Sequence, residues 1–291
     1  MVKQAYRIRK ASGKRVPFSL KKLEKSLRKA GTDEVLIREI LEHLPSVISE
    51  KTSTRDVFNL AYKMLKKKNK VVASRYSLKQ AIFALGPTGF PFERFVGAIF
   101  RSMGYHVEVG KNIQGKCVKH EVDVIARDDR HINFMECKFH SEQGRNCNVK
   151  TPLYVNSRFN DIVQAREAQQ VISQLIPQGW VVTNTRFTRD ALLYSQCAGL
   201  KILSWDAPKG KGLKDLIDHT GLYPITVSVL LTGREKAFLL SREVVLCKDL
   251  IDDKFYLDHL EISDDRKERI LREMHDLCDV KNKIYGKEYR G

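Results

Sequence analysis

Two short extended segments, residues 122–126 and 132–139, constrain the fold of this chain more than any other feature. The second is mostly apolar and ends in Glu136, Cys137 and Lys138. Because side chains alternate along a strand, Glu136 and Lys138 share one face and Cys137 lies on the other. If the segments pair as a hairpin, Asp123 of the first approaches Glu136. Two carboxylates and an ammonium group near a core are costly unless a cation binds the carboxylates, and Mg²⁺ prefers such oxygen ligands.

The spacing of Asp123 and the Glu136-Cys137-Lys138 triplet resembles the signature of the PD-(D/E)xK nuclease superfamily. The flanking sequence resembles its Mrr-type restriction endonuclease branch, over about residues 89–207. That part of the similarity rests on residues 89–95, 103–105, 181–184, 187–188, 191 and 199–203. Many members of the branch carry Gln where Glu136 stands, so this chain has the superfamily pattern instead.

The resemblance implies a Mg²⁺-dependent endonuclease that hydrolyses DNA phosphodiester bonds and leaves a 5′-phosphate. Asp123 and Glu136 would ligate the metal, with the Cys137 carbonyl as a third protein ligand. Lys138 would orient the attacking water and favour its deprotonated form. The metal would polarise the scissile phosphate and stabilise charge on the leaving 3′ oxygen.

Two further residues are candidates through the same resemblance. Glu93 lies beside an apolar stripe of helical spacing over residues 92–103. It is either a solvated first-turn Glu favoured by the helix dipole or a carboxylate that helps to hold the metal. Gln164 lies on a helix predicted to open at Arg158, where many relatives place a polar residue that reaches the metal centre. The polar segment 141–157 before that helix is predicted to be a functional or mobile loop.

The order of predicted elements after residue 88 is α-β-β-β-α-β-α-β, which indicates an α/β fold with a mixed sheet flanked by helices. Breaker clusters at 86–89 and 208–212 predict domains over residues 1–87, 88–207 and 208–291. The last region is predicted to be helical. Residues 222–226 and 231–249 faintly resemble helix-turn-helix units that grip DNA backbones, and a structural or oligomerising cap is the alternative. Residues 281–291 are predicted to be frayed.

The N-terminal region reads as a hairpin over residues 6–18 followed by four helical patterns, the last over 72–85. This order resembles the ATP-cone, a regulatory nucleotide-binding module, over about residues 6–85. The matching positions are Lys10, Gly13, Pro17, Phe18, Lys22, Thr54, Ala73, Arg75 and Tyr76.

The resemblance implies that Lys10, Arg15 and Lys22 meet the triphosphate of ATP or a related nucleotide. Thr54 is predicted to cap the third helix, a position that also suits phosphate. Val16 stands where cones commonly carry Glu on the ribose or adenine side. The chain has no G-x-x-x-x-G-K-[ST] motif, which argues against a P-loop motor.

Charge is distributed unevenly along the chain, whose net charge is +17. Residues 1–86 carry 21 Lys and Arg against 7 Asp and Glu, a net charge of +14. Such a balance favours a polyanion partner, although any single Lys run is more simply a solvated surface. The six cysteines form no C-x-x-C pair, which predicts neither a zinc site nor a disulfide framework and favours a reducing cytoplasm. No apolar run approaches the length of a membrane span.

The sequence therefore predicts a cytoplasmic, homo-oligomeric endodeoxyribonuclease of the restriction or defence type, regulated by nucleotide at its N-terminal domain. One alternative is a nucleotide-responsive DNA-binding regulator with a silent nuclease fold. Another is a junction-specific or RNA nuclease. The intact set of Asp123, Glu136 and Lys138 favours an enzyme over a silent fold.

Overall fold

The computed structural model describes residues 7–10, 13–49, 51–168 and 175–279. They divide into two compact units, each built from more than one stretch of the chain. The first unit draws on residues 1–81, 225–238 and 247–291, and the second on 82–224 and 239–246. The three domains expected from the sequence, with their two boundaries, stay a prediction. Among the described residues, no helix has the length and apolar character that crossing a membrane requires.

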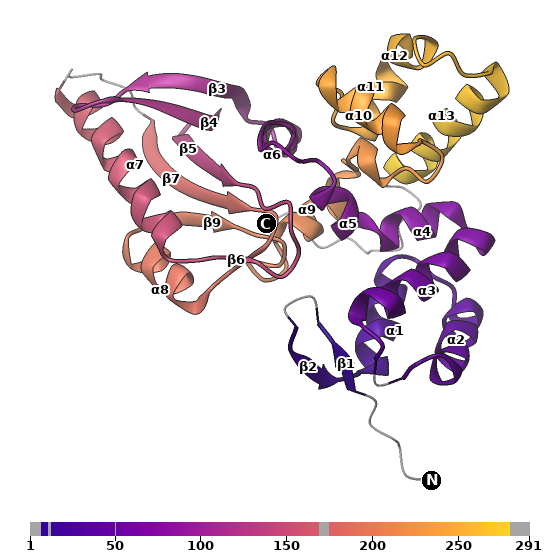
Figure 1. Cartoon of the computed structure of the whole chain (residues 1–291). Coiled ribbons are helices and arrows are strands. Elements are labelled where there is room, and N and C mark those ends of the chain that lie inside the picture. Colours follow the sequence, from indigo (N-terminus) through magenta and orange to yellow (C-terminus); the bar gives the residue numbers. More distant parts are fainter. Residues whose placement is uncertain (1–6, 11–12, 50, 169–174, 280–291) are drawn as a thin grey trace. The chain divides into compact units, whose positions relative to one another are not determined.

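A five-stranded mixed sheet forms the centre of the second unit (Figure 1). Its strands, in spatial order, are β3 (His106–Gln114), β4 (Lys119–Arg127), β5 (His131–Lys138), β7 (Ile176–Thr183) and β9 (Lys201–Leu203). The pairs β3–β4 and β4–β5 are antiparallel, and β5–β7 and β7–β9 are parallel. A short parallel pair consists of β6 (Asn146–Cys147) and β8 (Arg186–Phe187). The mixed α/β architecture predicted from the sequence is confirmed.

Helices pack on this sheet through apolar side chains. They are α6 (Phe90–Ser102), α7 (Lys150–Ala168) and α8 (Arg189–Cys197), whereas α9 (Leu213–Thr220) packs on α6. Helix α6 buries the predicted stripe, including Phe92, Phe95 and Ile99. It packs closely on β3, because a Cβ atom at Gly97 would lie only 3.0 Å from Val109. Helices α7 and α8 lie together along one side of the sheet (Figure 1), with Val155 and Ala191 in a shared core.

The prediction that the helix opens at Arg158 is wrong, because α7 already begins at Lys150. The backbone N–H of Lys150 donates to Asn148 Oδ1 at 3.0 Å, and Pro152 lies in the first turn, where its missing N–H costs nothing. The polar composition of 141–157 concealed this start. Part of the expected loop is therefore two turns of helix, and Arg158 lies well inside α7.

The first unit begins with a hairpin of β1 (Arg7–Arg9) and β2 (Arg15–Pro17), as predicted, although Tyr6 and the turn at 11–12 lie outside the described residues. Its N-terminal helices are α1 (Leu20–Lys29), α2 (Glu34–His43), the 3-10 turn η1 (Leu44–Ser46), α3 (Thr54–Lys68) and α4 (Lys70–Tyr76). They bury a continuous apolar core that includes Ile8, Leu27, Ile40 and Leu65.

Two details of the N-terminal helices differ from the sequence-based expectation. The cap of α3 is Ser53, not Thr54: Ser53 Oγ accepts from the Asp56 N–H, and Asp56 accepts from the Ser53 N–H. Thr54 is the first helical residue. The pattern over 72–85 is two helices, α4 and α5 (Leu78–Phe83), because the chain breaks at Ser77, whose N–H donates to Ser74 O.

The C-terminal region contributes further helices. They are η2 (Ile225–Val227), α10 (Gly233–Ser241), α11 (Cys247–Asp252), α12 (Phe255–Asp258) and α13 (Asp264–Cys278). Within the first unit, α13 packs on α4 and α11, and it buries Ile270, Met274 and Leu277. The frayed segment predicted for 281–291 lies outside the described residues.

A buried carboxylate fixes this packing. Glu273 of α13 is 4% exposed and accepts hydrogen bonds from Ser74 Oγ (3.4 Å), Ser228 Oγ (2.5 Å) and the Val229 N–H (2.8 Å). A buried charge is tolerated when donors surround it in this way. The first unit is therefore held together by side chains from widely separated parts of the sequence.

Replacement of Glu273 by Ala leaves these buried donors without an acceptor, so we expect the free energy of unfolding of the first unit to fall by about 2–3 kcal/mol. Far-UV circular dichroism in urea measures this change. Glu268→Ala is the matched control on the same helix, because its side chain is 77% exposed and contacts Arg272 at 3.8 Å. Equal stability of the two variants would contradict the role of Glu273.

Candidate active site

The β4–β5 ladder brings the predicted acidic residues together. Val124 pairs with Met135 and Ile125 with Phe134, so the positions just beyond the last pair of this ladder are Asp123 and Glu136. Strand β5 then alternates as predicted: Cys137 is buried, whereas Glu136 is partly exposed and Lys138 exposed. Glu136 and Lys138 share a face with Asp123 because of this antiparallel pairing.

Asp123 is held in place by the neighbouring strand. Its Oδ2 accepts a hydrogen bond from the backbone N–H of Cys137 at 2.6 Å. The thiol of Cys137 points to the opposite face, and burial raises its pKa well above the ordinary value. The thiolate is therefore disfavoured, and the carbonyl is the group of Cys137 that suits a hard cation.

The carboxylates are crowded and only partly hydrated. Burial, followed by the charges of Asp123, Glu121 and Glu136, raises the pKa of Glu93 in the first turn of α6 to about 7. Burial and the charge of Asp123 raise the pKa of Glu136 to about 7. The pKa of Asp123 is also raised, mainly by burial. Such shifts arise when several acids cannot all ionise without a counter-charge.

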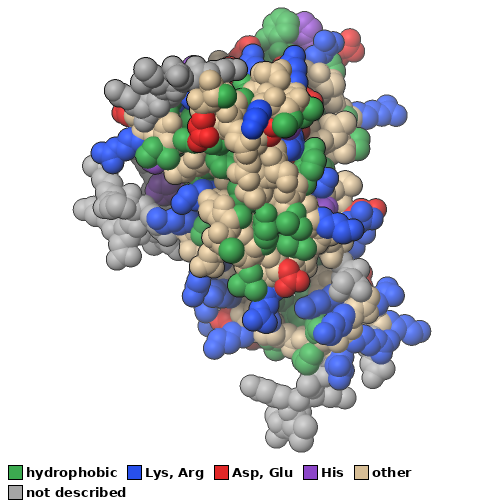
Figure 2. Space-filling view, turned by 90° about the vertical axis from the view of Figure 1, so that its left-hand side faces the viewer, with side chains coloured by type: hydrophobic (Ala, Val, Ile, Leu, Met, Phe, Trp, Pro, Cys, Tyr) green, Lys and Arg blue, Asp and Glu red, His purple; other side chains and the backbone are tan. Residues whose placement is uncertain are grey.

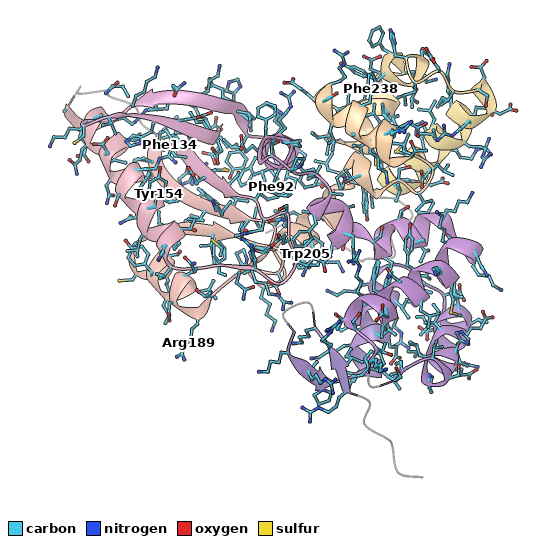
Figure 3. All side chains as sticks on the ribbon, viewed as in Figure 1. Phe92, Phe134, Tyr154, Arg189, Trp205 and Phe238 are labelled. Atoms are coloured by element: carbon cyan, nitrogen blue, oxygen red, sulfur yellow. The ribbon has the colours of Figure 1, made fainter. Side chains whose placement is uncertain are left out.

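Arg158 supplies such a counter-charge and was not among the residues predicted from the sequence. Its guanidinium forms an ion pair with Glu136 and also donates to the backbone carbonyl of Glu121. The guanidinium lies 5.3 Å from the ring centroid of Tyr154. Tyr154, labelled in Figure 3, lies one turn earlier on α7. Had the helix been predicted from Lys150, the spacing of Tyr154 and Arg158 would have placed both on one helical face.

Gln164 lies elsewhere on α7. It is six residues beyond Arg158, a rise of about 9 Å along the helix. Its Oε1 accepts a hydrogen bond from Lys116 Nζ at 3.3 Å, in the turn between β3 and β4. Near it, Asp161 binds His120 Nε2 at 2.7 Å and the Cys117 N–H at 2.9 Å. This end of α7 is thus bonded to the β3–β4 turn, and Arg158 is the α7 residue that reaches Glu136.

Polar side chains at and just after the end of β7 bond the chain where β5 ends. Thr183 Oγ1 donates to Lys138 O at 2.8 Å. The Asn184 amide accepts from the His140 N–H at 2.9 Å and donates to His140 O at 2.8 Å. Thr183 and Asn184 are fully buried. The backbone that presents Lys138 is therefore rigid, whereas the Lys138 side chain is free to reach solvent or a substrate.

The donor set suits a hard divalent cation. Two carboxylates and a neighbouring carbonyl are the oxygen ligands that Mg²⁺ accepts, and burial raises the pKa of both Asp123 and Glu136 because their charges are poorly hydrated. Within the described part of the chain, no group of three or more acidic, His or Cys side chains is already close enough to hold a metal ion. Glu136 instead forms an ion pair with Arg158.

A second candidate site lies within the first unit. A cavity of about 610 Å³ is lined by residues of the hairpin, α1, α3 and α4. Three of the four predicted nucleotide-binding residues, Lys10, Lys22 and Thr54, line it, and Arg15 is not among its lining residues. Its aromatic wall includes Phe58 and Tyr76, whose rings stack at 5.0 Å. Basic groups and flat rings in one cavity suit an anionic ligand with an aromatic part.

Comparisons with known proteins agree with the fold of the second unit. A family model described as "Restriction endonuclease" matches residues 87–209, and one described as "AF1548-like, C-terminal" matches residues 223–278. An uncharacterized protein of Archaeoglobus fulgidus is 32% identical over 149 residues, which are 51% of this chain and 79% of that protein. The crystal structure of a protein of unknown function, AF1548, matches with a TM-score of 0.54 at 26% identity, over 66% of this chain and 98% of that one.

The sheet, its flanking helices and the family match define residues 87–209 as a nuclease domain of the restriction-endonuclease type. The chain belongs to the family of the Archaeoglobus fulgidus protein.

The pKa of Glu93 makes the stability of this domain depend on pH. Because the folded protein favours the neutral acid, the folded state binds more protons than the unfolded state between pH 4.5 and about 7. Stability therefore falls as pH rises through this window. Glu93→Gln removes the ionisation, so we expect it to raise the free energy of unfolding at pH 8 by about 1 kcal/mol and to change it little at pH 4, after allowing for solvent screening.

Urea unfolding in a chelator, followed by tryptophan fluorescence, measures this effect, because Trp180 and Trp205 both lie in the second unit. Glu142→Gln is the control, since the Glu142 side chain is 67% exposed. A Glu93→Gln effect of the same size at both pH values would show that it is unrelated to ionisation.

Proposed function

We propose that this protein is a Mg²⁺-dependent endodeoxyribonuclease. The observation that supports this most is the pairing of β4 with β5, which puts Asp123, Glu136 and Lys138 on one face of the sheet in a restriction-endonuclease domain. Asp123, Glu136 and the Cys137 carbonyl are the proposed metal ligands. A bound Mg²⁺ would supply a nucleophile by lowering the pKa of a coordinated water and would stabilise charge on the scissile phosphate.

The protein's own groups have distinct roles in this proposal. The Cys137 N–H bonds Asp123 Oδ2, which leaves Oδ1 of the same carboxylate as a proposed metal ligand. The Lys138 ammonium, on a backbone bonded to Thr183, would orient the attacking water and favour its deprotonation. Glu93 lies close enough to interact with Asp123 and Glu136 electrostatically, which favours the reading in which it assists the metal site over that of a solvated helix cap.

DNA is the proposed substrate because the chain is strongly basic. Lys and Arg number 52 against 35 Asp and Glu, and basic side chains are frequent on the face drawn in Figure 2. Contacts with phosphates would carry most of the affinity, independently of the acidic residues that cut. Binding and cleavage should therefore be separable by mutation.

We expect Asp123→Ala to abolish Mg²⁺-dependent cleavage of plasmid DNA, because it removes a metal ligand, while DNA binding in a chelator stays within about twofold of wild type. Gel-shift and plasmid-nicking assays measure the two properties. Glu142→Ala, which removes an exposed carboxylate of the same unit, should cut normally. Wild-type cleavage rates for Asp123→Ala would overturn the assignment.

The alternative of a DNA-binding regulator with a silent nuclease fold is favoured by one observation, the bond between Glu136 and Arg158. In a silent site this ion pair would be permanent. The plasmid assay decides between the two, because a silent fold cuts no DNA at any Mg²⁺ concentration. The same assay, run with structured DNA and with RNA, tests whether the protein is a junction-specific nuclease or an RNA nuclease.

We further propose that ATP or a related nucleotide binds the cavity of the first unit and controls the nuclease. The supporting observations are the ATP-cone resemblance and the presence of Lys10, Lys22 and Thr54 around one cavity. Because the chain has no P-loop, the nucleotide would act by binding two states of the protein unequally. Two oligomers are the proposed states, and they would differ in how they bring nuclease domains together.

We expect Lys22→Ala to weaken ATP binding to the full chain about tenfold, since it removes one phosphate contact. Lys21→Ala is a close control, because Lys21 is the preceding residue of α1 and is not among the residues that line the cavity. Calorimetry measures binding, and light scattering with plasmid cleavage measures its consequence. An absence of ATP binding at millimolar concentration would rule out the sensor, and binding that leaves both oligomer size and cleavage unchanged would rule out control.

A further inference from the structure

Arg158 forms an ion pair with Glu136 in the acidic cluster of Glu93, Asp123 and Glu136, and its charge also acts on Asp123. Its side chain is 16% exposed and that of Glu136 is 24% exposed, so their ion pair is shielded from water. The guanidinium divides its donors: one nitrogen bonds Glu136 Oε2 and another bonds the Glu121 carbonyl. Tyr154 lies beside the same group. Arg158 is thus fixed by three partners, and just one of them is a proposed metal ligand.

Glu136 has two proposed partners, a metal ion and the Arg158 guanidinium, and their positive charges disfavour the binding of both at once. A divalent cation held between Asp123 and Glu136 would stand next to the guanidinium charge, and like charges repel strongly where water is scarce. A cation that takes the Glu136 carboxylate must also break or weaken its bond with Arg158. The free energy of that bond is therefore subtracted from the free energy of metal binding.

The contact with Glu121 makes this competition effective. Because a backbone carbonyl and an aromatic ring hold the guanidinium, Arg158 does not need Glu136 in order to stay in place. An Arg side chain suits this arrangement, since its planar fork reaches two acceptors at once. A Lys side chain has the same charge but a single nitrogen.

We propose that Arg158 competes with divalent cations for Glu136 and so sets the metal affinity of the site. The inference rests on the proposed metal-dependent nuclease function. Arg158 is a positioning residue in this scheme: it holds Glu136 while metal is absent and keeps the carboxylates from repelling one another. Metal then binds only where its own attraction exceeds that of the guanidinium.

A purely structural role for Arg158 predicts the opposite effect of mutation. If Arg158 only braces α7 against β4 and β5, its loss lets Glu136 move, and metal binding weakens or stays the same. If Arg158 is a competitor, its loss frees Glu136, and metal binding becomes tighter. The direction of the change in metal affinity therefore separates the two roles.

The experiment titrates the full chain, without DNA, with Mn²⁺ and measures free Mn²⁺ by electron paramagnetic resonance. Mn²⁺ accepts the same oxygen ligands as Mg²⁺. We expect Arg158→Met, which keeps an apolar stem of similar length, to bind Mn²⁺ about tenfold more tightly than wild type. The Mn²⁺ affinity of Arg158→Lys should lie between those of wild type and Arg158→Met. Lys keeps the positive charge but has no second nitrogen with which to bond two acceptors at once.

Arg127→Met is the matched control. Arg127 also forms an ion pair within the second unit, with Glu108 of β3, but neither residue belongs to the acidic cluster. We expect its Mn²⁺ affinity to equal that of wild type. Urea unfolding followed by tryptophan fluorescence establishes whether each variant is folded. If Arg158→Met is unfolded, the test is whether Arg158→Lys binds Mn²⁺ more tightly than wild type.

Asp123→Ala separates the failure of this inference from that of the proposed function. If it leaves Mn²⁺ binding unchanged, the metal is not at this site, and the nuclease mechanism fails together with the inference. If Asp123→Ala removes binding, but neither Arg158 variant binds Mn²⁺ more tightly than wild type, the mechanism stands and the competition by Arg158 is refuted.

Discussion

The antiparallel register of β4 and β5 is the constraint on which the rest of the site depends. It places Asp123 beside Glu136 and leaves Lys138 on the same face. Backbone hydrogen bonds fix this register, so the carboxylates cannot move apart to relieve their repulsion. Two contacts offset this repulsion: the Cys137 N–H donates to Asp123, and the Arg158 guanidinium forms an ion pair with Glu136. Burial and the charge of Asp123 still raise the pKa of Glu136 to about 7.

Buried acids serve two different purposes in this chain. Glu273 is surrounded by donors, so its charge is satisfied and the residue holds α13 against α4. Glu93 and Glu136 are partly buried among other acids, and their pKa values rise. A buried carboxylate that accepts hydrogen bonds from several donors stabilises a fold. A cluster of partly buried acids becomes favourable in its ionised form only when a cation binds. This contrast separates structural acids from candidate catalytic ones without any reference to relatives.

In the first unit, N-terminal and C-terminal segments of the chain pack together. The proposed nucleotide cavity has Tyr76 of α4 in its wall, and α4 is the helix on which α13 packs. Residues 225–238 and 247–279 therefore complete the unit that contains the cone-like helices. An experiment on the N-terminal segment alone would remove that support, which is why the full chain is the appropriate material for nucleotide binding.

The sequence by itself determined the α/β class, the hairpin with Asp123 and Glu136, and the N-terminal hairpin with its first three helices, because these depend on local alternation, helical periodicity and breakers. Only the tertiary structure decided that Arg158 reaches Glu136 while Gln164 bonds Lys116, since these contacts depend on which face of α7 packs on the sheet. It also decided that Glu273 meets Ser74 and Ser228, far apart in sequence. Contacts of this kind follow from packing, which no local pattern encodes.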